Sequence, residues 1–189
     1  MLSDQLRQKI IEVYPRELKK SGTLFVLENV PPKKLKSVTG SYAKIGDNET
    51  VIMLYDNTVF GSAKDGFLLT SKRLYGKVML ERADSVEVAE ITNLSLDTSV
   101  TYPEIFAETG LKTLKLQVNL GKEDIQAKFT FLKNTIELLQ GKKLVHVEGA
   151  SAKNNVTAVE SAPQKTVNCS SCGAVGQSGV CEYCGSALE

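Results

Sequence analysis

The sequence lacks tryptophan, contains a single histidine, and has no cysteine before residue 169, although four cysteines follow. No uninterrupted apolar run approaches the roughly 18 residues that a transmembrane helix requires. The first ten residues carry charges at Asp4, Arg7 and Lys9, so they lack the apolar stretch of a secretory signal peptide. We therefore expect a cytoplasmic protein, in which clustered cysteines serve as metal ligands or redox groups rather than as disulfides.

Groups that commonly carry catalysis are also scarce. The single histidine, His146, has no evident partner that would orient it as a general base. Three aspartates, Asp56, Asp65 and Asp124, are explained as turn formers, because their side chains accept local backbone hydrogen bonds. The chain contains no Gly-rich phosphate loop, GxSxG or HExxH motif. The sequence therefore predicts a protein that is not an enzyme.

The formal net charge of +1 conceals an uneven distribution along the chain. Residues 1–45 carry a net charge of +5, residues 46–148 carry −3, and residues 149–189 carry −1. The basic head includes Lys19, Lys20, Lys33, Lys34 and Lys36. A solvated helix surface is the simpler interpretation of these lysines. The alternative is that Lys33, Lys34 and Lys36 bind an anionic ligand or an anionic membrane surface.

The spacing of apolar residues predicts two helices followed by several strands. One helix begins after Ser3, a favourable N-cap, and the second begins at Pro32, which suits the first helical position. The expected strands are Glu49–Tyr55, Gly66–Thr70, Leu74–Leu80, Leu114–Leu120 and Ile125–Phe129. A last helix is expected from Thr130 to Gly141. This order predicts an α+β fold, in which an antiparallel barrel or roll is closed by one helix.

The composition divides the chain into four parts. Residues 149–168 contain no aromatic residue, leucine or isoleucine, so they cannot bury enough apolar surface to offset the entropy of ordering. We expect a helical head at 1–45 packed on a strand domain at 46–148, a flexible linker at 149–168, and a small cysteine module at 169–189.

The cysteine module contains two CxxCG sequences. Cys169 and Cys172 belong to CSSCG, and Cys181 and Cys184 belong to CEYCG. Each CxxC turn brings two sulfurs close enough to share one ion, and four thiolates at about 2.3 Å close a tetrahedral zinc site. A thioredoxin-type redox pair would require a single CxxC in a βαβ context. The sequence therefore predicts one structural Zn²⁺, with iron as the alternative for the same ligands.

The charge of this module bears on its partner. Residues 169–189 contain no lysine or arginine, and four thiolates on Zn²⁺ leave a formal charge of −2. A nucleic acid would be repelled, because its affinity for proteins depends on phosphate neutralisation. We therefore expect a structural role or a contact with a protein partner.

Two segments carry a resemblance to a known family. The sequence reads DNTVFGS from Asp56 to Ser62 and KDGFLLT from Lys64 to Thr70, followed by Leu74 and Tyr75. Over residues 30–142 the chain resembles the bacterial pleckstrin-homology-like (PH-like) domains, the YokE-like and related groups. The resemblance implies a seven-stranded, strongly bent β-barrel capped by the C-terminal helix. The terminal CxxCG pair is similar to zinc ribbons appended to bacterial proteins.

The resemblance brings no catalytic residues with it. Lipid-binding members of the wider superfamily carry several basic residues in the loop between their first two strands. Here the corresponding loop, Asp56–Asp65, has Lys64 alone, so specific phosphoinositide binding is disfavoured. We expect a non-enzymatic PH-like interaction or adaptor module with a structural zinc ribbon that mediates protein–protein contacts. The alternative is peripheral membrane or anionic-ligand binding through the basic N-terminal helices.

Overall fold

The computed structural model describes residues 2–118 and 124–142, together with the backbone of four short strands between residues 166 and 188. The chain divides into two compact units, Met1–Val145 and His146–Glu189, which are described separately. Among the described residues, none of the helices is both long and apolar enough to cross a bilayer.

The two expected N-terminal helices are confirmed. Helix α1 spans Asp4–Glu12, and the Ser3 side chain caps it by accepting a hydrogen bond from the Leu6 amide (3.3 Å). Helix α2 spans Pro32–Ser41. Single-turn 3₁₀ helices, η1 (Glu17–Lys20) and η2 (Leu27–Asn29), occupy the segment between them.

The last helix, α3, spans Ile125–Leu139, so the prediction of a strand at Ile125–Phe129 was wrong. Five residues that alternate in polarity also fit the first turns of an amphipathic helix. The buried side chains of α3 continue at helical spacing over four turns, which decides the conformation. Those side chains belong to Ile125, Lys128, Phe131, Leu132, Thr135, Ile136 and Leu138.

A five-stranded antiparallel sheet forms the centre of the first unit. Its strands, in both chain and spatial order, are β1 (Leu24–Val26), β2 (Val51–Asp56), β3 (Gly66–Thr70), β4 (Arg73–Lys77) and β5 (Asp84–Glu87). The head therefore contributes an edge strand as well as helices. All of β3, and all of β2 except its first residue, is buried, which indicates that both faces of the sheet are covered.

A second antiparallel sheet contains β6 (Ile91–Asp97), β7 (Glu104–Thr109) and β8 (Thr113–Gln117). The α+β fold is confirmed, but the expected bent β-barrel is not closed, because the described strands form two separate hydrogen-bonded sheets. A 3₁₀ turn, η3 (Val88–Glu90), separates β5 from β6. The two sheets pack closely at Gly76 of β4, which the Leu116 side chain of β8 contacts. A Cβ added at Gly76 would lie 2.4 Å from a Leu116 methyl group.

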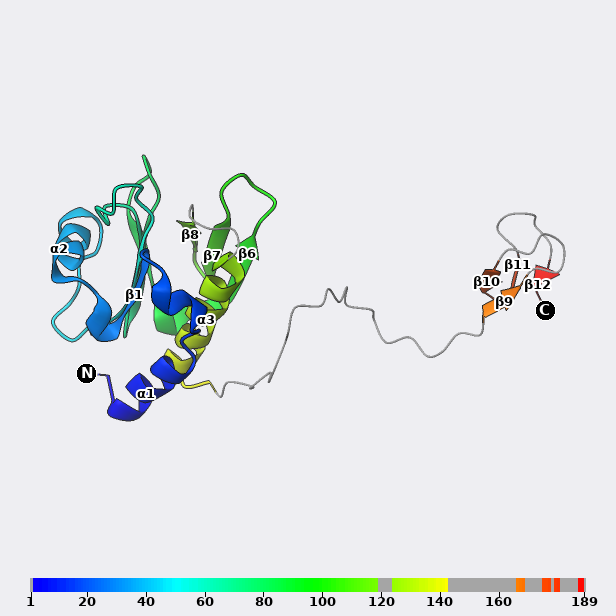
Figure 1. Cartoon of the computed structure of the whole chain (residues 1–189), viewed down its shortest axis with the longest axis horizontal. Coiled ribbons are helices and arrows are strands. Elements are labelled where there is room, and N and C mark those ends of the chain that lie inside the picture. Colours follow the sequence, from blue (N-terminus) through cyan, green and yellow to red (C-terminus); the bar gives the residue numbers. More distant parts are fainter. Residues whose placement is uncertain are drawn as a thin grey trace. The chain divides into compact units, whose positions relative to one another are not determined.

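The two faces of the larger sheet are covered differently (Figure 1). Helix α2 lies on one face, where Val38 and Tyr42 pack with Leu54, Leu68 and Tyr75. The opposite face contributes to the main core, which also includes residues of α1, the second sheet and α3. Because α2 packs on the first face, it also lies beside the loops at the edge of that face.

The second unit contains two short strand pairs. Strand β9 (Thr166–Asn168) pairs with β10 (Val175–Gln177), and β11 (Gly179–Val180) pairs with β12 (Ala187–Leu188), both antiparallel. The four cysteines and His146 lie outside the described residues, as does the expected linker up to residue 165.

Candidate functional site

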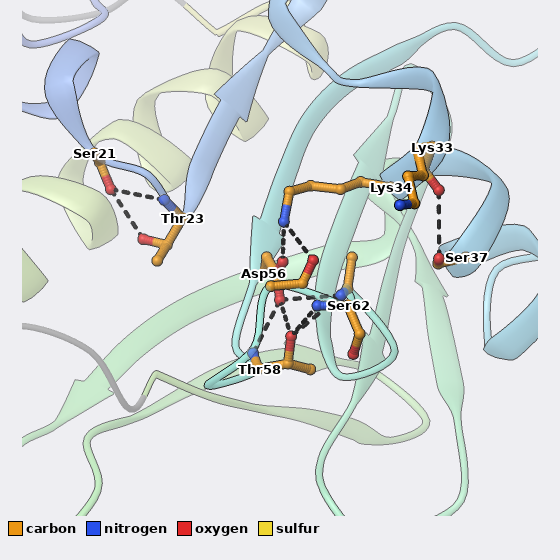
Figure 2. Close-up of polar contacts among 10 residues, drawn as sticks. Ser21, Thr23, Lys33, Lys34, Ser37, Asp56, Thr58 and Ser62 are labelled. Carbon is orange, nitrogen blue, oxygen red and sulfur yellow. Dashed lines mark hydrogen bonds and ion pairs between the residues drawn. The ribbon is translucent and has the colours of Figure 1, made fainter.

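The loop between β2 and β3 is organised around the carboxylate of Asp56, whose side chain is 2% exposed (Figure 2). The Oδ1 atom of Asp56 accepts hydrogen bonds from the Thr58 amide (2.9 Å), the Thr58 hydroxyl (2.5 Å) and the Ala63 amide (3.2 Å). The Thr58 hydroxyl oxygen in turn accepts a bond from the Ser62 amide (2.7 Å). These bonds join the start of the loop to its end.

Lys34 attaches this loop to α2. Its Nζ atom donates to Asp56 Oδ2 and to the Gly61 carbonyl (2.7 Å), and it lies 5.3 Å from the centre of the Phe25 ring. Burial would raise the pKa of Asp56, but the bonds from Lys34 and Thr58 outweigh it and hold that pKa below its ordinary value. The carboxylate is therefore charged at neutral pH, and the loop has a fixed anchor.

The backbone of the loop is also constrained where it turns. Gly61 has φ +66°, and Gly66, where β3 begins, has φ +129°. A Cβ atom at Gly66 would lie 2.1 Å from the Tyr55 carbonyl oxygen, so only glycine fits this position. With the polar groups turned inward, the two apolar residues at the turn face water: Val59 is 84% exposed and Phe60 is 96% exposed.

The turn between β4 and β5 displays two more apolar residues. The Glu81 amide donates to the Val78 carbonyl (3.0 Å), which closes a β-turn with Met79 and Leu80 at its centre. Leu80 has φ +66° and is 98% exposed, while Met79 is 64% exposed. The left-handed region is unfavourable for leucine, and turns of this kind normally place glycine or asparagine there.

These two loops leave the same end of the sheet. Strands β2 and β4 both run antiparallel to β3 between them, so the loops that follow them emerge together (Figure 1). An ion pair between Lys77 Nζ and Asp65 Oδ1 (3.7 Å) joins the end of β4 to the end of the first loop. We call the four exposed apolar residues at this end, Val59, Phe60, Met79 and Leu80, the apolar tip.

The charges near the apolar tip are unbalanced. Its carboxylates are all paired with lysines, in the pairs Asp56–Lys34, Asp65–Lys77, Glu81–Lys115 and Asp84–Lys112, and Lys115 is shared with Glu104 (3.8 Å). Four exposed basic residues have no ion pair within the described part of the chain: Lys33, Lys36, Lys64 and Arg82. The surroundings of the tip therefore present unneutralised positive charge.

The basic residues singled out from the sequence have different surroundings. Lys33 and Lys36 are exposed on α2, beside the lysine that contacts the Gly61 carbonyl. Lys34 itself is only 19% exposed and is engaged with Asp56. Lys19 and Lys20 lie on η1, where the Lys19 ammonium is 5.9 Å from the Tyr14 ring centre. Of the three candidate ligand-binding lysines, two are available to a ligand.

The apolar tip was missed from sequence. The expected strand Leu74–Leu80 ends instead at Lys77, so Met79 and Leu80 belong to a turn. Val59 and Phe60 lie between the expected strands Glu49–Tyr55 and Gly66–Thr70, where the residue pattern predicts no functional surface. The available signal was an apolar pair enclosed by turn formers, as in DNTVFGS, which is unusual because turn centres are generally polar.

The predicted metal ligands, Cys169, Cys172, Cys181 and Cys184, fall outside the described residues. Within the part of the chain that is described, no cluster of three His, Cys, Asp or Glu side chains could hold a metal ion. Comparison with known proteins finds no matching family model, no matching curated protein and no matching solved structure.

Proposed function

We propose that this protein is a non-enzymatic adaptor with two binding parts, a PH-like domain and a structural zinc ribbon. The observation that carries the proposal is the apolar tip. Phe60 and Leu80 are held in water by an internal polar network and by a turn that leucine disfavours. A fold that maintains such exposure at one end has a surface suited to binding.

The arrangement of strands supports the PH-like part of the proposal. Strands β2 to β5 form one antiparallel meander, β6 to β8 form a second, and α3 follows. The resemblance implies seven strands followed by one C-terminal helix, and β2 to β8 followed by α3 have that number and order. Strand β1 precedes residues 30–142, over which the chain resembles that family, and α2, within them, positions the loop that bears Phe60.

The short strands of the second unit support the zinc ribbon. Strand β9 pairs with β10 and β11 pairs with β12, both antiparallel, and small modules of short antiparallel strand pairs suit a structural metal site. The CxxC sequences that contain the four expected ligands follow β9 and β11 in the chain and lie outside the described residues. A four-thiolate Zn²⁺ site there would supply folding energy rather than chemistry.

The zinc assignment is tested by metal analysis of the full chain expressed without added metal. We expect one zinc ion per chain, and a Cys172→Ser substitution to remove it. A matched Ser171→Ala substitution, next to the same cysteine, should leave the metal content unchanged. Iron in place of zinc, or full metal content in the Cys172→Ser protein, contradicts the assignment. A cytoplasmic location, where these thiols stay reduced, is part of the proposal.

The binding role of the apolar tip is tested by photo-crosslinking in cells that express the full chain. Benzoylphenylalanine replaces Phe60 in one variant and exposed Lys72, in the turn between β3 and β4, in the control. We expect adducts with a partner, whether protein or lipid, from position 60 and none above background from position 72. Equal yields at both positions, or none at position 60, would contradict the proposed binding role.

A further inference from the structure

The side chains of the apolar tip project into solvent. Phe60 and Leu80 are almost fully exposed, at the ends of two turns from separate loops. A protein partner would need two matching pockets with the right spacing to bury them. A lipid bilayer makes no such demand, since its interfacial region accepts protruding apolar side chains of varied shape.

Internal hydrogen bonds hold both loops in the conformation that exposes Phe60 and Leu80 before any partner binds. The bonds of Lys34 and Thr58 to Asp56 hold the turn that bears Phe60, and the hydrogen bond from Glu81 to Val78 holds the turn that bears Leu80. Insertion would therefore require little ordering of the backbone. Preorganised loops lose less entropy on binding, which favours reversible attachment by a few side chains.

The charge around the tip favours an anionic surface. Lys33, Lys36, Lys64 and Arg82 are exposed and have no ion pair among the described residues. Asp65 is paired with Lys77, and Glu81 shares Lys115 with Glu104, so the four unpaired cations outnumber the one uncompensated carboxylate. Lys64 and Arg82 lie in the two loops themselves, and Lys33 and Lys36 are exposed on α2, which contacts the first loop through Lys34 (to the Gly61 carbonyl) and Ser41 (to the Lys64 carbonyl). Long basic side chains can reach lipid phosphates while neighbouring apolar groups enter the interface.

We propose that the apolar tip inserts into the interfacial region of a bilayer containing anionic lipids, and that Lys33, Lys36, Lys64 and Arg82 contact the headgroups. The inference rests on the proposed function and names the partner of the same surface. Recognition is by charge and apolar insertion, without a pocket for one particular headgroup.

The absence of tryptophan allows a direct test on the full chain. Phe60→Trp and Leu80→Trp each introduce the sole tryptophan, and Ile11→Trp on α1, at a position 42% exposed, is the control. The proteins are mixed with phosphatidylcholine vesicles with and without phosphatidylglycerol. We expect a blue shift, and quenching by brominated lipid, at positions 60 and 80 on the anionic vesicles only. Unchanged emission at both positions at low salt would overturn the inference.

Vesicle sedimentation measures how strongly each variant partitions onto anionic vesicles. The double variant Phe60→Asp/Leu80→Asp should lose at least roughly tenfold in partition onto anionic vesicles, since both apolar contacts are removed. Lys33→Gln/Lys36→Gln should lose roughly 30-fold, from about 1 kcal/mol for each lysine near the surface. Ile11→Asp should bind as the unchanged protein does, and equal urea midpoints should show that the variants fold.

The outcomes separate this inference from the proposed function. If the unchanged protein fails to bind anionic vesicles at low salt, or if the aspartate variant binds as well as the unchanged protein, membrane insertion is wrong. Protein adducts from position 60 would then leave the binding role of the tip in place with a protein partner. Absence of both vesicle binding and adducts would remove the two together.

Discussion

The two ends of the five-stranded sheet use buried carboxylates for different purposes. At the end where β3 passes into β4, the Thr70 hydroxyl donates to Glu49 Oε2 (2.6 Å), and Arg73 Nε donates to Glu87 Oε1 (2.7 Å). We call this cluster, with the Tyr75 hydroxyl that donates to the Lys44 carbonyl (2.8 Å), the polar end. Its groups stabilise one another, and its turn, Ser71–Lys72, displays no apolar side chain.

At the opposite end, the carboxylate of Asp56 holds a loop whose turn is apolar and exposed. Both ends are formed by the same strands, so the difference does not arise from sheet geometry. The polar end shows that a turn of this sheet can be closed with polar residues. The fold therefore does not require the exposed apolar residues of the tip, and the following predictions separate stability from the proposed binding at the two ends.

The largest expected effect is that of Asp56→Ala. Removal of the carboxylate leaves the largely buried Lys34 ammonium without its partner and frees the Thr58 and Ala63 amides. We expect the free energy of unfolding to fall by about 3 kcal/mol, measured by urea denaturation. The control is Asp97→Ala, since Asp97 accepts similar bonds from the exposed Ser99 and pairs with no lysine among the described residues. Equal losses would show that the Lys34 pair has no special role.

At the polar end, Thr70→Val should cost about 1.5 kcal/mol, because the fully buried hydroxyl bonds to both Glu49 and the Arg73 amide (2.9 Å). Urea denaturation measures the loss. Binding to anionic vesicles should be unchanged, because this end takes no part in insertion. Thr92→Val is the control, since Thr92 is exposed on β6 and its hydroxyl donates to the Glu108 carbonyl of β7 (3.1 Å). Loss of vesicle binding in a folded Thr70→Val protein would contradict the separation of the two ends.

Leu80→Gly should raise the free energy of unfolding, in contrast to the two substitutions above. Leucine is strained at φ +66° and its side chain is exposed, so glycine should raise the free energy of unfolding by about 0.5 kcal/mol. The same substitution should weaken vesicle binding, because an inserted side chain is lost. Met79→Gly, at a neighbouring position without positive φ, should destabilise instead. A loss of stability in Leu80→Gly would show that strain at this position is negligible.

The smallest expected effect is on the pH dependence of stability. The pKa of Asp56 is held below its ordinary value, so its carboxylate stabilises the fold above the unfolded pKa, and this contribution is lost as the pH falls through the folded pKa. Between about pH 6 and pH 3 the unchanged protein should therefore lose more stability than Asp56→Asn. Urea denaturation across this range provides the comparison, and parallel profiles would contradict the role assigned to the pair.

Local patterns in the chain were sufficient for several elements. Ser3 and Pro32 mark the starts of two helices because capping and the φ of proline are properties of adjacent residues. The segment Ile125–Phe129 was misread because five residues fit both periodicities, and only packing over the following turns distinguishes them. Closure of the expected β-barrel likewise depends on pairing between strands that are distant in the sequence, and the described strands form two sheets instead.

The sequence by itself determined the α+β composition, the two N-terminal helices and the spacing of the four cysteines, because each depends on neighbours along the chain. Tertiary structure alone decided which of the basic residues are available. Lys34 meets Asp56 only when α2 packs over the sheet, and Lys33 and Lys36 remain exposed beside it. It also decided that Phe60 and Leu80, twenty residues apart, share one end of the sheet. Pairing of distant strands creates that surface, and no local pattern encodes it.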